Sequence, residues 1–304
     1  MRVAVLGAGG TGGFFGGLLA RAGEDVVFVA RGAHLEALRQ RGLVVRSHAA
    51  GEFALPVQAT DRTECLGLAD LVLVCVKTYD TEAALHLLPP LVGPHTVIFS
   101  VQNGVDNAEI IGRAVGAEHV LGAVAYVSAV REFPGVVRHL GGPGKLVLGE
   151  LSGGASPRLE QLRAALERAG IPVEVSPNVP VAICQKFLFI CAFSGTTALT
   201  RLPIGPILAC PQTRELFCGL VLEAEAVGRA CGVKLPHDCV ATAEAFEPWA
   251  TSSLSADLAA GKRLELEALH GTVVRLGHHH RVPTPLSFAV YAALKPYGDG
   301  PHGT

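Results

Sequence analysis

The sequence predicts an α/β domain followed by an all-helical domain. Short, apolar, β-branched runs such as Arg2–Leu6 and Leu71–Val76 alternate with helical patterns in the first part of the chain. This alternation is typical of a sheet of buried, mainly parallel strands covered by helices. After a turn-rich segment at residues 176–180 only helical patterns follow. We therefore expect one domain over residues 1–176 and a second over residues 177–304.

Composition limits the kinds of partner that the chain can have. Its 304 residues suit two domains of about 150 residues each. A hydrophobic content of 49%, a charged content of 17% and a net charge of −2 indicate a compact protein that binds neither nucleic acid nor an anionic membrane. The sequence contains no apolar run of the ~18 residues that a membrane span needs. The eight cysteines form no C-x-x-C pair and are expected to be reduced core residues, which favours the cytoplasm.

A glycine-rich loop follows the first predicted strand. Gly7, Gly9 and Gly12 form the pattern G-x-G-x-x-G, and Gly10 and Thr11 lie where the next helix begins. The first glycine permits a tight turn, the second lets the backbone approach a pyrophosphate, and the third lets the helix pack closely on the strand. A strand before the loop and a helix after it favour a Rossmann-like dinucleotide-binding domain over a tight turn without a ligand.

The end of the second predicted strand indicates which dinucleotide binds. Asp25–Ala30 is followed by Arg31, close to the place where an acidic residue holds the ribose 2′-hydroxyl in NAD-binding domains. The planar guanidinium of an arginine suits a 2′-phosphate instead. The cofactor is therefore expected to be NADP(H), although an ordinary solvated arginine would give the same sequence.

Two further apolar strands end in polar residues. Leu71–Val76 is followed by Lys77, and Thr96–Val101 is followed by Gln102 and Asn103. Open α/β sheets bind ligands at the carboxyl ends of their strands, so Lys77 and Asn103 are candidates for the cofactor and substrate site. A solvated loop lysine and an Asn-Gly turn are the alternatives. Beyond them, the runs 121–130, 135–139 and 145–148 are expected to add antiparallel strands to the sheet.

The helical part contains few polar residues that could carry chemistry. Lys186 lies in the apolar run QKFLFICAF, where a lysine must reach solvent or find a partner. Ser252 and Ser253 precede a helical pattern over residues 254–276 and suit either a helix N-cap or substrate binding. Glu265 suits either a solvated helix face or the site. The histidines at 278–280 are adjacent and have no spaced carboxylate or thiolate, so we expect no metal site.

These features together resemble the ketopantoate reductase (2-dehydropantoate 2-reductase) family over nearly the whole chain. The resemblance rests on the order and spacing of several motifs, since each motif alone is common. They are the glycine pattern at Gly7, Gly9 and Gly12, then Arg31, V-K-T-Y at 76–79, Q-N-G at 102–104, Lys186, S-S at 252–253, and Glu265 in LELEALHG.

The resemblance implies a Rossmann-like domain that binds NADPH, a helical second domain, and an active site in the cleft between them. It implies that Lys186 is the general acid on the ketone of a 2-oxo acid and that Glu265 orients it. It also implies that Asn103 lies near the nicotinamide and that Ser253 binds the substrate carboxylate. A homodimer is compatible with this family.

The chain departs from the family four and eight residues after the lysine. Family members typically carry asparagine at both positions, on the lysine's face of the helix, whereas this chain has Ile190 and Ser194. The resemblance implies reduction of ketopantoate to pantoate. The two departures leave a more apolar 2-oxo acid as the alternative substrate. An NADP(H)-binding sensor without turnover is a further alternative. A purely structural subunit is disfavoured because the glycine pattern is intact.

Overall fold

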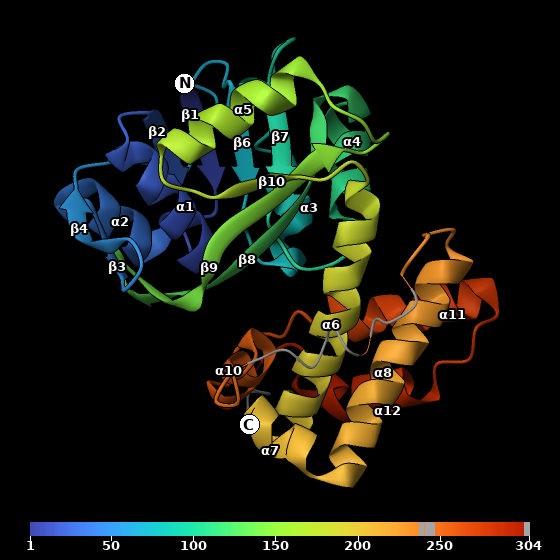
Figure 1. Cartoon of the computed structure of the whole chain (residues 1–304). Coiled ribbons are helices and arrows are strands. Elements are labelled where there is room, and N and C mark those ends of the chain that lie inside the picture. Colours follow the sequence, from blue (N-terminus) through green and yellow to red (C-terminus); the bar gives the residue numbers. More distant parts are fainter. Residues whose placement is uncertain (237–239, 241–246, 301–304) are drawn as a thin grey trace. The chain divides into compact units, whose positions relative to one another are not determined.

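The computed structural model describes residues 1–236, 240 and 247–300. The chain forms two compact units. Residues 1–102 and 106–182 make the first, and residues 103–105 and 183–304 make the second. The first is blue to green in Figure 1, and the second is mainly yellow to red. The division falls after Ala182, whereas the turn-rich segment predicts it after Ser176.

The first unit is built on one mixed sheet. Among the described residues ten strands pair in the order β4-β3-β9-β8-β7-β6-β1-β2-β5, with β10 added beside β9. The strands are β1 (Arg2–Leu6), β2 (Asp25–Val29), β3 (Leu43–Ser47), β4 (Gly51–Leu55), β5 (Gln58–Thr60), β6 (Leu71–Val74), β7 (Val97–Ser100), β8 (Val120–Phe133), β9 (Val136–Glu150) and β10 (Val173–Val175). Its helices are α1 (Gly10–Arg21), α2 (Gly32–Arg41), α3 (Thr81–Leu85), α4 (Asn107–Val115) and α5 (Pro157–Arg168).

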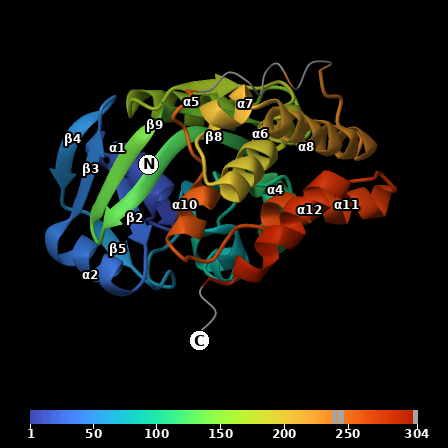
Figure 2. The same cartoon turned by 90° about the horizontal axis from the view of Figure 1, so that it is seen from below.

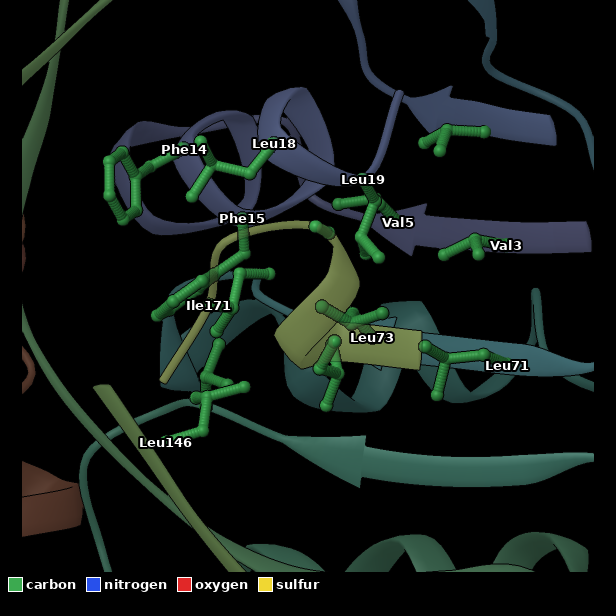
Figure 3. Packing of buried hydrophobic residues seen from close by; sticks show 14 of the residues in the cluster. Val3, Val5, Phe14, Phe15, Leu18, Leu19, Leu71, Leu73, Leu146 and Ile171 are labelled. Atoms are coloured by element: carbon green, nitrogen blue, oxygen red, sulfur yellow. The ribbon is translucent and has the colours of Figure 1, made fainter. Parts of the chain in front are cut away.

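The centre of this sheet is parallel and buried, as its continuous apolar strands predict. Strand β1 pairs in parallel with β2 on one side and with β6 on the other, and β6 pairs in parallel with β7. Helix α1 packs on the sheet, and Figure 3 shows Phe15 and Leu19 of α1 beside Val5 and Leu73 of the strands. Burying each such side chain stabilises the fold by ~1.5–3 kcal/mol.

A long hairpin replaces the separate short strands expected after residue 121. The patterns at 135–139 and 145–148 belong to one strand, β9, which pairs antiparallel with β8 (Figure 2). The glycine-rich stretch between them remains paired through shifts in register, for example between Tyr126 and Ser128. Gly142 and Gly144 adopt positive φ there, so the glycines form bulges and do not end the strand.

The second unit is helical. Among the described residues its helices are α6 (Val179–Thr200) from Ile183 onward, α7 (Ile204–Ala209), α8 (Pro211–Ala230), α10 (Ser253–Ala259), α11 (Thr272–His280) and α12 (Pro285–Leu294), with a π-helical turn, η4 (Glu267–Gly271). The helix expected over residues 254–276 is thus divided, because α10 ends at Ala259 and Gly261 adopts a positive φ. The apolar pattern over residues 254–276 is therefore shared by several short elements, each of which contributes buried residues to the core of the unit.

Helix α6 is long and apolar enough to cross a membrane by length and composition alone. In the structure 56% of its most apolar window is buried. Leu188, Cys191 and Ala192 belong to the core of the helical unit. The helix therefore has the character of the core helix of a folded domain.

The cysteines only partly follow the prediction. The seven described cysteines are all free thiols, and Cys184 and Cys191 are buried. However, Cys65, Cys210 and Cys231 are exposed, because each lies at the end of an element or in a loop and not within an apolar run. Cys239 lies outside the described residues.

Candidate functional site

The glycine-rich loop joins β1 to α1 in a tight turn. Gly7 adopts φ +100° and donates its N–H to the Val29 carbonyl of β2. A side chain at Gly7 would meet the backbone of Val76, and one at Gly12 would fall well inside van der Waals contact of the Gly7 carbonyl oxygen. Gly7 and Gly12 are therefore required by the packing of the loop itself.

Gly9 differs from its neighbours because the space beside it is open. A Cβ atom built on Gly9 would have no atom within 4 Å. Gly9 is the N-cap of α1, so Gly10 and Thr11 begin the helix and their N–H groups lie at its positive end. Open space beside an uncapped helix N-terminus fits the pyrophosphate of a dinucleotide.

Arg31 lies at the N-cap of α2, directly after β2. Its guanidinium is 3.8 Å from the carboxylate of Asp80, and both side chains are largely exposed. An exposed ion pair of this length contributes little to stability. Arg31 can therefore exchange Asp80 for a more highly charged partner such as a phosphate.

Gln102 connects the ends of β6 and β7. Its side-chain amide donates to the Val76 carbonyl (2.9 Å) and to the Thr81 hydroxyl (2.8 Å), while its oxygen accepts from Ser100 (2.8 Å). Lys77 lies within the segment that these bonds hold. Gln102 is part of the Q-N-G pattern, but the sequence gives it no role. Its hydrogen bonds, which clamp the two loops together, form only because β6 and β7 are neighbours.

Asn103 follows this clamp and belongs to the second unit. Nearby Val105 packs against the hydrophobic core of the helices, which explains the assignment.

The predicted site residues fall into two groups. Gly7, Gly9, Gly10, Thr11, Gly12, Arg31 and Lys77 lie in the first unit, and Asn103, Lys186, Ile190, Ser194, Ser253 and Glu265 lie in the second.

Lys186 is the candidate proton donor. It lies on α6, and the residue as a whole keeps part of its surface accessible although protein surrounds its ammonium group. Desolvation lowers the pKa of Lys186 to about 8, and the negative charge of Glu265 opposes this shift. The charge of Glu265 thus acts on Lys186 within the helical unit. A lysine with such a pKa can both hold and release a proton near neutral pH.

Ile190 and Ser194 lie one and two turns further along α6. Ile190 is partly exposed, and it packs against the core of the helical unit. Ser194 is buried, and its hydroxyl donates to the Ile190 carbonyl at 2.5 Å. This donor is used within the helix. Ser194 can thus offer a substrate its acceptor lone pairs, but its proton only if this bond breaks.

The two serines before α10 have different surroundings. Ser252 is the N-cap, accepts a hydrogen bond from the Ser255 N–H (3.0 Å), and shares a hydrogen bond with the Thr197 hydroxyl of α6 (2.7 Å). Ser253 is the first helical residue and is exposed. The capping role thus belongs to Ser252, which leaves Ser253 as the serine with an accessible side chain.

The histidine run at residues 278–280 lies at the end of α11. His279 and His280 contact each other edge to face. Among the residues that the structure describes, no group of three or more His, Cys, Asp or Glu side chains is placed to hold a metal ion.

Comparison with known proteins agrees with these features. The family described as ketopantoate reductase PanE/ApbA matches residues 3–153, and its C-terminal domain matches residues 178–298. A 2-dehydropantoate 2-reductase of Mesorhizobium japonicum is 33% identical over 97% of both chains. The crystal structure of a PanE/ApbA family ketopantoate reductase from Ralstonia eutropha has a TM-score of 0.90, with 34% identity over 98% of both chains.

A D-mandelate dehydrogenase solved with NADH and anilino(oxo)acetate also has a TM-score of 0.90. At 20% identity this likeness concerns the fold alone. The family matches cover both units and the predicted residues from Gly7 to Glu265. On the strength of those matches and of the full-length relative, this chain belongs to the ketopantoate reductase family.

Proposed function

We propose that this protein is an NADPH-dependent reductase that converts 2-dehydropantoate (ketopantoate) to pantoate. The observation that carries the proposal is Lys186, a lysine of lowered pKa on an apolar helix, on which the negative charge of Glu265 acts. The glycine-rich loop with open space at Gly9 supports dinucleotide binding. The names of the curated relatives support the substrate.

The proposed chemistry needs a cation beside the carbonyl oxygen of the substrate. A bound nicotinamide cofactor would supply a hydride to the carbonyl carbon, and the C=O electron pair would then move onto the oxygen. Lys186 stabilises the developing negative charge and donates its proton to that oxygen, which leaves a hydroxyl group and a neutral amine. Glu265 keeps the lysine protonated until that step because its negative charge raises the lysine pKa.

The remaining site residues have roles in the proposal that follow from their chemistry. Arg31 binds the 2′-phosphate, and Lys77 with Asn103 lines the nicotinamide end of the cofactor. Ser253 binds the substrate carboxylate. The reaction requires Lys186 to reach the carbonyl oxygen of the substrate while the nicotinamide faces the carbonyl carbon.

Ile190 supports a second candidate function, the reduction of a 2-oxo acid with a plain apolar side chain. An isoleucine cannot hydrogen-bond the hydroxyl of ketopantoate, and Ser194 already donates to the Ile190 carbonyl. A buried hydroxyl left without a partner costs roughly 1 to 3 kcal/mol. That is about one to two factors of ten in kcat/KM between the two substrates.

The test is NADPH consumption against a panel of 2-oxo acids that includes ketopantoate and 2-oxoisovalerate. We expect turnover in the unmodified protein and a loss of about 10² or more in kcat for Lys186→Ala, with NADPH still bound. Lys234→Ala, at an exposed lysine of the same unit, is the control. Binding of NADPH without turnover of any 2-oxo acid would identify a sensor instead.

The same panel decides between the two substrates. If ketopantoate is the poorer substrate and Ile190→Asn improves it, the apolar alternative is correct. A strong native preference for ketopantoate that Ile190→Asn leaves unimproved would remove it. We also propose that the protein is cytoplasmic and that it can form a homodimer, which fractionation of cells and analytical ultracentrifugation would check.

A further inference from the structure

His34 of α2 connects the glycine-rich loop to a distant hairpin. Its side chain is buried, with 4% of its surface exposed. The ring nitrogen Nε2 lies 2.6 Å from the carbonyl oxygen of Ala8, the residue between Gly7 and Gly9. The other nitrogen, Nδ1, lies 2.9 Å from the backbone nitrogen of Gly135, in the turn between β8 and β9.

These two partners determine which nitrogen carries the proton. A backbone N–H can only donate, so Nδ1 must accept from Gly135. A backbone carbonyl can only accept, so Nε2 carries the hydrogen and donates to Ala8. Both polar atoms of the neutral ring are used, and both partners are main-chain atoms of segments that lie far from His34 in the sequence.

The bond to Ala8 acts on the next residue through peptide planarity. The carbonyl of Ala8 and the N–H of Gly9 belong to one planar trans peptide group, so they point in opposite directions. Holding the carbonyl on His34 therefore directs the N–H of Gly9 away from His34. Gly9 is also the residue of the loop with open space beside it.

The β8–β9 hairpin that holds Gly135 is itself fixed by contacts with neighbouring elements. Gly135 adopts φ +83°, and its carbonyl accepts from the Val44 N–H of β3 (2.9 Å). Gly10 packs so closely on the Ala129 carbonyl of β8 that a side chain could not fit. The same hairpin therefore supports the loop at two points, directly at Gly10 and through His34 at Ala8.

We propose that His34 is a positioning residue for dinucleotide binding, which sets the Ala8–Gly9 peptide so that the Gly9 N–H is presented to the pyrophosphate. This inference rests on the proposed binding of NADP(H). It assigns a cofactor role to a residue whose ring bonds only the backbone of Ala8 and Gly135 among the hydrogen bonds found in the described residues.

Two substitutions separate the bonds of the ring. The amide of asparagine reaches the position of Nδ1, so His34→Asn keeps an acceptor for Gly135 and loses the bond to Ala8. The longer glutamine reaches the position of Nε2, so His34→Gln keeps a donor for Ala8. We expect His34→Asn to weaken NADPH binding about tenfold, with kcat at saturating NADPH within about twofold of the unmodified value.

His34→Gln should bind NADPH within about threefold of the unmodified protein, which would be rescue by the longer amide. His48→Asn, at an exposed histidine of the same unit, is the control. Fluorescence titration measures NADPH affinity, and a melting curve without cofactor measures stability. If His34→Asn lowers the melting temperature but binds NADPH normally, the role is structural and the proposal is wrong.

A measurement on the unmodified protein serves if neither variant folds. Nitrogen-15 NMR of labelled histidine should show His34 as the Nε2–H tautomer with and without NADPH, and an Nδ1–H tautomer would overturn the proposal. If the unmodified protein binds no NADPH at all, the proposed function fails, while the tautomer still tests the connection between loop and hairpin.

Discussion

At the scale of single residues, Lys186 makes a prediction about pH. The proposed general acid must be protonated in the free enzyme, and desolvation lowers its pKa to about 8. We therefore expect kcat/KM for reduction to be constant below that pH and to fall as the pH rises through about 8.

Glu265→Gln should move this fall to lower pH, because the charge that it removes raises the lysine pKa. Glu267→Gln is the matched control. Glu267 lies two residues further along but pairs with Lys295 and Tyr291. A profile that keeps its midpoint in Glu265→Gln would contradict the coupling between the two residues.

Arg31 makes a prediction about cofactor choice. Its guanidinium lies 3.8 Å from the carboxylate of Asp80, a weak and exposed pair that a 2′-phosphate can displace. Arg31→Ala should raise KM for NADPH and leave KM for NADH nearly unchanged. Steady-state kinetics with both cofactors measures this, and equal weakening for the two would remove Arg31 from the 2′-phosphate site.

At the scale of elements, the loop between β1 and α1 distinguishes two functions of glycine. In Gly12→Ala the new methyl group would collide with the Gly7 carbonyl, so both the melting temperature and NADPH affinity should fall. In Gly9→Ala the methyl group enters open space at an ordinary φ of −69°.

We therefore expect Gly9→Ala to melt within a few degrees of the unmodified protein and to bind NADPH at least about tenfold more weakly, because the methyl group blocks the approach of the phosphate. Thermal unfolding without cofactor and a binding titration separate the two effects. Normal NADPH affinity in Gly9→Ala would show that the pyrophosphate lies elsewhere.

At the scale of the whole molecule, buried His270 makes stability depend on pH. Neither of its ring nitrogens has a well-formed hydrogen bond among the described residues, and Gly195 of α6 packs against its ring. Burial lowers the pKa of His270 to about 4, with the Cys191 carbonyl opposing this shift. The folded protein keeps the ring neutral, whereas the unfolded chain binds a proton below about pH 6.5.

The unfolded state therefore binds more protons between about pH 6.5 and pH 4, and the free energy of unfolding should fall as the pH drops through this range. Between pH 7 and pH 5 the loss from this one group is about 2 kcal/mol. Urea unfolding at pH 7 and pH 5 measures it, with His270→Asn expected to show a smaller difference. An equal difference in that variant would assign the pH dependence to other groups.

The sequence alone was sufficient for the features that depend on neighbours along the chain. The central strands β1, β2, β6 and β7 are mostly apolar runs, as buried parallel strands require. The spacing of the glycines in the loop is the spacing that close packing of the turn and helix requires. Lys186 was recognisable because a lysine in an apolar helix needs a partner. The family resemblance then indicated Glu265 as that partner.

Tertiary structure decided the features that depend on residues far apart. Strand β9 is continuous because β8 pairs with it across its glycines, although the glycines alone predict a break. His34 bonds Ala8 and Gly135, which are separated from it by 26 and 101 positions in the sequence. Gln102 bonds the Val76 carbonyl across a separation of 26 positions. These bonds exist only when the sheet is assembled. The hydrophobic pattern of one strand or helix depends on which of its faces is buried, so it can be recognised in the sequence. Hydrogen bonds between elements depend on which elements become neighbours in the fold.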